Sequence, residues 1–95
     1  MQTTLVFHTD EHYCRYRIPG MVVTSHGTLL LYCEARTAQS DWAKMDILLY
    51  RSEDGGDSFT DPIVIACGTD EYRTVNNPVC IVDGETLHFL YCRDY

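Results

Sequence analysis

The distribution of apolar residues along the chain is the feature that most restricts its fold. Apolar segments are short, rich in β-branched and aromatic residues, and separated by turn residues at fairly regular intervals, which is typical of β-strands. No segment keeps a helical apolar period, so no helix of consequence is expected. The pattern predicts strands over residues 18–24, 28–34, 46–52, 62–66, 78–82 and 86–92. Tight hairpins at 25–27 and 83–85 would connect them in antiparallel pairs, which makes the expected fold all-β.

The charge balance limits the kinds of partner. Fourteen acidic residues against seven basic ones give a net charge of −7, which argues against nucleic acid or an anionic membrane surface as a general partner. An anionic ligand would therefore need a local cluster of arginines, because remote charges are screened over roughly 8 to 10 Å at physiological salt. No apolar run approaches the length of a membrane span, so no membrane segment is expected in this chain.

Targeting and metal signals are absent from the sequence. The N-terminus has neither a basic region nor a sustained apolar region, so no signal peptide is expected, and a cytoplasmic location is favoured unless an export signal lies outside this chain. His8 and His12 lack obvious further ligands and are expected at the surface. An odd number of cysteines without zinc-ligand spacing predicts reduced core thiols and no metal site. These are Cys14, Cys33, Cys67, Cys80 and Cys92.

The sharpest motif is S-E-D-G-G-D-S-F over residues 52–59, which fits the pattern S-x-D-x-G-x-x-aromatic at every defined position. It resembles the Asp-box (BNR repeat) of sialidases. Ser52 and Asp54 can bond nearby backbone groups, Gly56 can adopt a positive φ, and Phe59 can pack under the turn. The expected role of all four residues is structural, with Asp54 holding a turn at the periphery of a propeller blade rather than taking part in catalysis.

The sequence Tyr16-Arg17-Ile18-Pro19 resembles the [FY]-R-I-P motif on the first strand of sialidases. The resemblance implies that Arg17 is the first of three arginines that bind the substrate carboxylate. A planar guanidinium suits this task because it donates two parallel hydrogen bonds to a carboxylate, and lysine cannot. Pro19 is expected near the start of the strand, where a missing backbone donor is tolerated.

A second arginine and an aspartate follow at the family spacing, since 36 − 17 is 19 and 41 − 36 is 5. The resemblance implies that Arg36 lies near the carboxylate or the 4-substituent of the substrate, and that Asp41 is the general acid/base on a mobile loop. To be protonated, Asp41 needs a pKa raised by partial burial or by the substrate. Trp42 is expected to supply an apolar wall and to contact the substrate.

Two further polar residues are open to alternative interpretations. Asn77, before a proline, matches a sialidase position near the N-acyl and 4-hydroxyl groups of the sugar, although a simple Asn-Pro turn without a ligand is nearly as good an explanation. Glu34 either orients an arginine or is an exposed acid on its strand, and it is not included in the catalytic set.

Taken together, these motifs identify the chain as similar to the N-terminal part of an exo-α-sialidase (neuraminidase). The resemblance implies a six-bladed β-propeller, of which residues 1–95 would form the first one to two blades of a single partial domain. An L-Y-C sequence ending at Cys33 and again at Cys92 weakly supports a repeated blade. The rest of the propeller would be needed to close the fold.

The resemblance also implies a function. The parent protein would be a glycoside hydrolase that releases terminal α-linked sialic acid from glycoconjugates with retention, through a tyrosyl-sugar intermediate and without a metal or other cofactor. The nucleophilic tyrosine, its glutamate partner and the remaining arginines would lie beyond residue 95. Tyr91 and Tyr95 are not expected to be the nucleophile. The 95-residue chain by itself is expected to be inactive.

Three alternatives remain. The first is a non-catalytic Asp-box propeller that binds carbohydrate. The second is a related glycosidase or lyase that acts on another acidic sugar. The third is a purely structural β-repeat protein, against which the spacing of the arginines and the aspartate argues.

Overall fold

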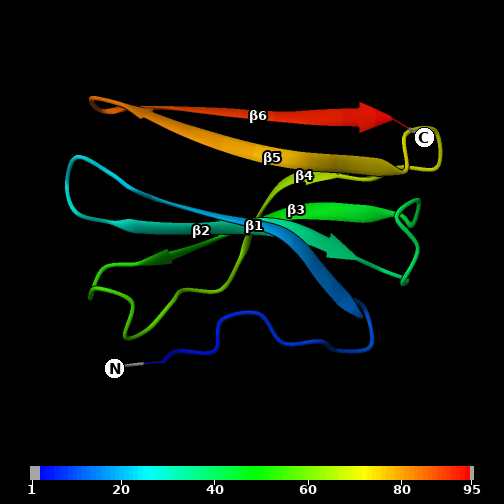
Figure 1. Cartoon of the computed structure of the whole chain (residues 1–95), viewed down its shortest axis with the longest axis horizontal. Helices are drawn as coiled ribbons and strands as arrows, with labels where there is room; N and C mark the ends of the chain where they lie inside the picture. The colour runs from blue at the N-terminus through cyan, green and yellow to red at the C-terminus, as the bar shows by residue number, and fades with distance from the viewer. Residues whose placement is uncertain (1–2, 95) are drawn as a thin grey trace.

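A computed structural model describes residues 3–94 as two antiparallel β-sheets with no helix in that range (Figure 1). The strands are β1 (Arg15–Val23), β2 (Leu29–Arg36), β3 (Met45–Ser52), β4 (Ile63–Cys67), β5 (Thr74–Asp83) and β6 (Thr86–Asp94). The first sheet has the order β1-β2-β3-β4, and the second contains only β5 and β6. Within the described residues, no helix has the length and apolar character needed to cross a membrane. The expected all-β fold of antiparallel hairpins is confirmed.

The two prolines in β1 and β5 lie inside their strands. Pro19 and Pro78 were expected at strand starts, but β1 begins at Arg15 and β5 at Thr74. Each strand accommodates its proline at an irregularity where the pairing register shifts. The residue before each proline has a positive φ, 55° at Ile18 and 54° at Asn77. Such a conformation is unusual for residues other than glycine and is sterically costly for a β-branched side chain. The two hairpins thus share a strained bulge at the same place.

The first sheet is a central layer whose two middle strands, β2 and β3, are buried on both faces. Figure 1 shows the N-terminal segment on one side of it and the β5–β6 hairpin on the other. The buried residues between the two sheets are Leu30, Tyr32, Met45, Ile47, Leu49, Ala66, Val75 and Cys80. The residues packed on the other face are Val6, Phe7, Tyr13, Tyr16, Leu31, Ala35, Leu48, Tyr50 and Phe59. Burial on both faces explains the continuous apolar runs at residues 29–33 of β2 and 47–50 of β3.

The repeated L-Y-C sequence does not mark equivalent positions. Tyr32 lies opposite Gly20, the first paired residue after the bulge, and a Cβ on Gly20 would be 2.3 Å from the Tyr32 ring. In the second hairpin the first paired residue after the bulge lies opposite Leu90, not Tyr91. Tyr32 is buried, whereas Tyr91 is 41% exposed. The two hairpins correspond through their bulges rather than through these tyrosines.

The cysteines divide into buried and exposed thiols, and all five are free. Cys33 and Cys80 are buried, Cys14 is intermediate, and Cys67 and Cys92 are exposed. Burial raises the pKa of the Cys33 thiol to about 12, which keeps it protonated at neutral pH. The expectation of core thiols is therefore correct for Cys33 and Cys80 and wrong for Cys67 and Cys92.

Candidate functional site

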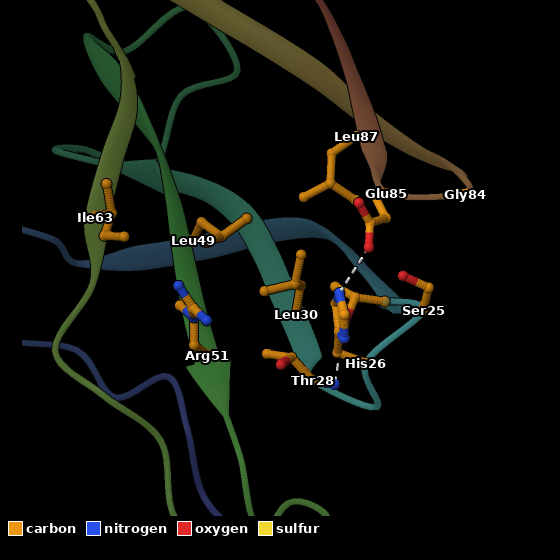
Figure 2. Close-up of a pocket in the computed structure, with 11 residues that line it drawn as sticks. Ser25, His26, Thr28, Leu30, Leu49, Arg51, Ile63, Gly84, Glu85 and Leu87 are labelled. Carbon is orange, nitrogen blue, oxygen red and sulfur yellow. Dashed lines mark hydrogen bonds and ion pairs between the residues drawn. The ribbon is translucent and has the colours of Figure 1, made fainter.

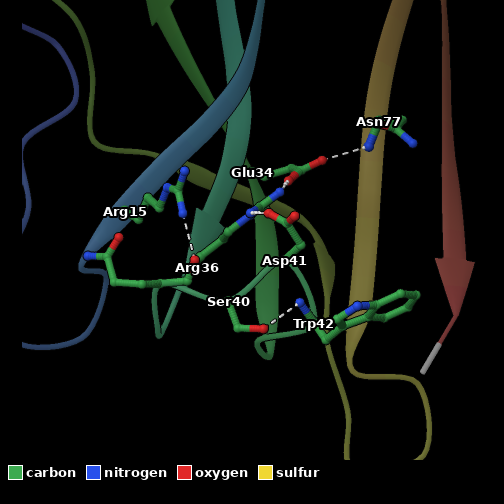
Figure 3. A network of polar contacts seen from close by, with 8 residues as sticks. Arg15, Glu34, Arg36, Ser40, Asp41, Trp42 and Asn77 are labelled. Atoms are coloured by element: carbon green, nitrogen blue, oxygen red, sulfur yellow. Dashed lines mark hydrogen bonds and ion pairs between the residues drawn. The ribbon is translucent and has the colours of Figure 1, made fainter.

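The candidate site lies where β2 ends and the loop of residues 37–44 leads to β3 (Figure 3). Glu34 and Arg36 are two positions apart, so their side chains lie on the same face of β2. They are paired with Ile47 and Met45 of β3, whose side chains belong to the core between the sheets. The charged pair therefore continues a row of core side chains at the edge of the inter-sheet core.

The guanidinium of Arg36 is almost completely buried. Its Nε and Nη2 atoms donate to Glu34 Oε1 at 3.1 and 2.7 Å, and the two residues are 5% and 0% exposed. Burial alone would lower the pKa of Arg36, but its hydrogen bonds to Glu34 and Asp41 outweigh that effect and raise the pKa. A buried charge is tolerated when it is paired and hydrogen-bonded in this way. Arg36 is thus a fixed positive charge.

Asp41 contacts the same guanidinium from the solvent side. Arg36 Nη1 donates to Asp41 Oδ1 at 2.6 Å, while the Asp41 side chain is 74% exposed. The hydrogen bond and charge of Arg36, followed by the charges of Arg17 and Arg15, lower the pKa of Asp41. The expected partial burial is not observed, because Trp42 is 64% exposed and its indole extends away from the Asp41 carboxylate (Figure 3). In this state Asp41 is a carboxylate at neutral pH.

The loop that carries Asp41 is anchored at its base. Thr37 donates its hydroxyl to the carbonyl oxygen of Lys44 at 2.7 Å, which closes the loop on itself. Arg15 Nη1 donates to the carbonyl oxygen of Gln39 at 2.6 Å and ties the loop to β1 (Figure 3). Sequence reasoning missed Arg15, although the alternation Arg15-x-Arg17 on a strand places both residues on one face. The base of the loop is held while its tip remains exposed.

Arg17 lies directly opposite Glu34 in the pairing of β1 with β2 and is partly buried. Directly opposite residues share a face of the sheet, so Arg17 belongs to the same face as Glu34 and Arg36. Three arginines and two carboxylates, those of Glu34 and Asp41, leave one excess positive charge at this site. The protein as a whole is acidic, with a net charge of −7, so this site differs from it in the sign of its charge. The site is therefore a local cluster of arginines of the kind that an anionic ligand would need in this acidic chain.

Asn77 reaches the site through its main chain. Its backbone N–H donates to Glu34 Oε2 at 2.8 Å, whereas its side chain is exposed (Figure 3). Glu34 is therefore a buried partner that orients an arginine, and the alternative of an exposed strand acid is wrong. The pairing of Glu34 with Arg36 could be anticipated from their spacing. The contact with Asn77 could not, because the two residues are 43 positions apart.

Residues 52–59, the segment that resembles an Asp-box, form a turn between β3 and β4. The Ser52 hydroxyl donates to Asp54 Oδ1 at 2.8 Å and accepts from the Gly56 N–H at 2.8 Å, while the Ser58 N–H donates to Asp54 Oδ1 at 2.9 Å. Gly56 has a φ of 96°, and Phe59 packs on the core of the first sheet. The hydrogen bonds from Ser58, then from Ser52, lower the pKa of Asp54 to about 2. These hydrogen bonds place the Asp54 carboxylate inside the turn.

A cavity of about 540 Å³ lies at the opposite end of β2 from Arg36 (Figure 2). Leu30 and Leu49 contribute apolar walls, and an ion pair of 3.3 Å between His26 Nε2 and Glu85 Oε1 joins the tips of the two hairpins at its rim. None of the site residues expected from the sequence lines it. Within residues 3–94, no group of three or more His, Cys, Asp or Glu side chains is placed to hold a metal ion.

The Arg36 cluster combines two groups that carboxylate binding and proton transfer require, a guanidinium and an exposed carboxylate. A guanidinium has five N–H donors, and the contacts with Glu34 and Asp41 use three of those of Arg36. Two further N–H groups of Arg36 remain, but its side chain is only 6% exposed, so a ligand would reach the guanidinium only after Asp41 moves aside. No protein-family model matches this chain.

Proposed function

We propose that this chain supplies the first carboxylate-binding arginine, Arg17, and the general acid/base, Asp41, of an exo-α-sialidase, with Arg36 beside the carboxylate or the 4-substituent of the substrate. The observation that carries the proposal is the 2.6 Å contact between Arg36 and Asp41, two residues that the family spacing had singled out. An exposed carboxylate on an anchored loop, next to a buried and fixed guanidinium, is suited to proton transfer beside a bound anion. The six-bladed propeller that would complete the site belongs to this same proposal.

Binding of the sugar carboxylate would use Arg17, with Arg36 close to the same carboxylate or to the 4-substituent of the sugar. Sialic acid carries its acid group at the anomeric carbon, so a guanidinium that holds this group also fixes the position of the scissile bond. The excess positive charge of the site favours a monoanionic sugar over a neutral one. Trp42, exposed on the loop beside Asp41, offers an apolar surface to the bound ligand. The side chain of Asn77 is exposed and available to neutral groups of the sugar.

The proposed acid/base role requires the pKa of Asp41 to rise when substrate binds. In the free protein Arg36 holds this pKa below its ordinary value. A substrate carboxylate that takes over donors of Arg36 would weaken that ion pair and add a second negative charge nearby. Both changes raise the pKa of Asp41. Binding would thus prepare the acid that protonates the leaving oxygen, and the same group would then accept a proton from the attacking water.

The test is release of a fluorogenic aglycone from an α-linked sialoside by the longest product of the parent gene, since the resemblance places the nucleophile beyond residue 95. We expect hydrolysis by the wild type and a fall in kcat of about 10²- to 10⁴-fold in Asp41→Asn, the usual contribution of general acid/base catalysis. Asp61→Asn, which changes an exposed aspartate outside the site, is the matched control and should retain full activity.

A folded parent that binds sialic acid without hydrolysing the sialoside would contradict the proposal and favour the carbohydrate-binding propeller. Hydrolysis of a glycuronide in place of the sialoside would instead favour a glycosidase specific for another acidic sugar. Equal activity of the wild type and Asp41→Asn would remove Asp41 from the mechanism.

A further inference from the structure

Glu34 divides its two carboxylate oxygens between the two sheets. Oε1 accepts from Nε and Nη2 of Arg36, on the same strand of the first sheet. Oε2 accepts from the backbone N–H of Asn77, in the bulge of β5 in the second sheet. The side chain is fully buried, so solvent cannot replace either partner. One carboxylate therefore connects the arginine of the site to the backbone of the opposing sheet.

The geometry requires a group that accepts hydrogen bonds on both sides. A glutamine at this position would turn its NH₂ group toward either the Arg36 guanidinium or the Asn77 N–H, and each choice places two donors against each other. An aspartate would keep the charge but lose one methylene of reach. The buried donor left without a partner would then carry the full cost of its desolvation. Glutamate is the side chain that satisfies both contacts at once.

Two parts of the site depend on these contacts. Arg36 has a long, flexible side chain, and two of its N–H groups are fixed by Glu34, which directs Nη1 toward Asp41. Asn77 has a φ of 54°, a conformation that is uncommon for residues other than glycine, and its N–H is fixed by Glu34. We propose that Glu34 is a positioning residue that couples the orientation of the Arg36 guanidinium to the docking of the β5 bulge. The proposal rests on the proposed function only in treating Arg36 as the group that binds the ligand.

The experiment compares Glu34→Gln and Glu34→Asp with the wild-type chain by NMR. Glu53→Gln is the matched control, because Glu53 also pairs with an arginine two positions away, Arg51, at 3.0 Å, but its side chain is 63% exposed. We expect hydrogen exchange of both the Asn77 N–H and the Arg36 Nε–H to become roughly tenfold faster or more in the Glu34 variants, as loss of a hydrogen bond to a charged group implies. Glu53→Gln should change neither rate.

The pKa of Asp41 gives a second readout whose sign separates positioning from simple electrostatics. The charged groups that act on Asp41 are Arg36 of β2 and Arg17 and Arg15 of β1. Removing the negative charge of Glu34 would by itself lower the pKa of Asp41 further. Loss of the orientation of Arg36 would instead weaken the ion pair and raise it. The proposal predicts that Glu34→Gln raises the pKa of Asp41.

A pKa of Asp41 that falls or stays constant in Glu34→Gln, with unchanged exchange at Asn77, would overturn the proposal. If Glu34→Gln does not fold, the wild type decides: the Arg36 Nε–H must exchange roughly tenfold more slowly than the exposed Arg51 Nε–H, and equal rates would refute the coupling. None of these measurements requires turnover. If the parent protein hydrolyses no sialoside, the proposed function is refuted, but the positioning role of Glu34 is not.

Discussion

Asp41 and Asp54 are both exposed aspartates with a lowered pKa, but the groups that lower the pKa differ between the two regions. The pKa of Asp41 is lowered by a charged partner, Arg36, that is itself held by the packing of two sheets. The pKa of Asp54 is lowered by neutral hydroxyl and backbone donors from its own turn, first those of Ser58. We expect a competing anion to be able to displace Asp41 from Arg36. We do not expect an anion to displace Asp54 in the same way, because its hydrogen-bond donors are part of the turn itself.

The largest difference between the two regions should appear in stability. Ser52 is buried, and its hydroxyl both donates to Asp54 and accepts from the Gly56 N–H. We expect Ser52→Ala to lower the free energy of unfolding by about 1 to 3 kcal/mol, because buried polar groups lose their partner. Ser40→Ala, in the loop of Asp41, should change it by less than about 0.5 kcal/mol, since Ser40 is exposed. Urea unfolding measures both, and equal losses would show that the two regions contribute alike.

The next largest effect should be the pH-dependent contribution of Asp54, in the turn, to the free energy of unfolding. The pKa of Asp54 is about 2 in the folded chain against an ordinary value of 3.8, so the folded state favours the carboxylate. This contribution is fully present above the ordinary pKa and is lost as the pH falls from there through the folded-state pKa. Ser58→Ala removes the first cause of the shift and should move the pKa of Asp54 up toward its ordinary value. A carboxyl-carbon NMR titration that finds the same pKa in Ser58→Ala would contradict this assignment.

The smallest expected effect is that of salt. Raising the ionic strength from about 0.05 M to about 1 M shortens the screening length to roughly 3 Å. The pKa of Asp41, lowered partly by the charges of Arg36, Arg17 and Arg15, should rise toward its ordinary value. The pKa of Asp54 depends on neutral donors and should change much less. The same NMR titration at both salt concentrations tests this, and parallel shifts would mean that both carboxyl groups depend on charge.

Local sequence patterns were enough to predict the strands and the turn at residues 52–59. Alternation and turn residues located all six strands, and the hydrogen bonds of Ser52 and Asp54 connect residues within a few positions of each other. The strand starts were misplaced because proline was expected to begin a strand. Pro19 and Pro78 instead lie in bulges whose positive φ has no signature in the sequence.

The candidate site was predictable only in part, because some of its contacts follow from sequence spacing and others depend on how the two sheets pack. The family spacing singled out Arg36 and Asp41, and the structure brings them into contact. The burial of Glu34 and its bond to the Asn77 backbone depend on how the sheets pack, which no local pattern encodes. The lowered pKa of Asp41 likewise follows from the position of Arg36 rather than from its neighbour Trp42.

We expect the hydrogen bond between Glu34 and Asn77 to form late during folding. The first sheet and the β5–β6 hairpin are each built from strands that are adjacent in the chain, and contacts of this kind form early. The bond that joins them spans 43 residues and has to wait for the longer chain closure. We therefore expect a nascent chain to complete its strands while Arg36 is still unconstrained, so that the assembled site marks a late step of folding.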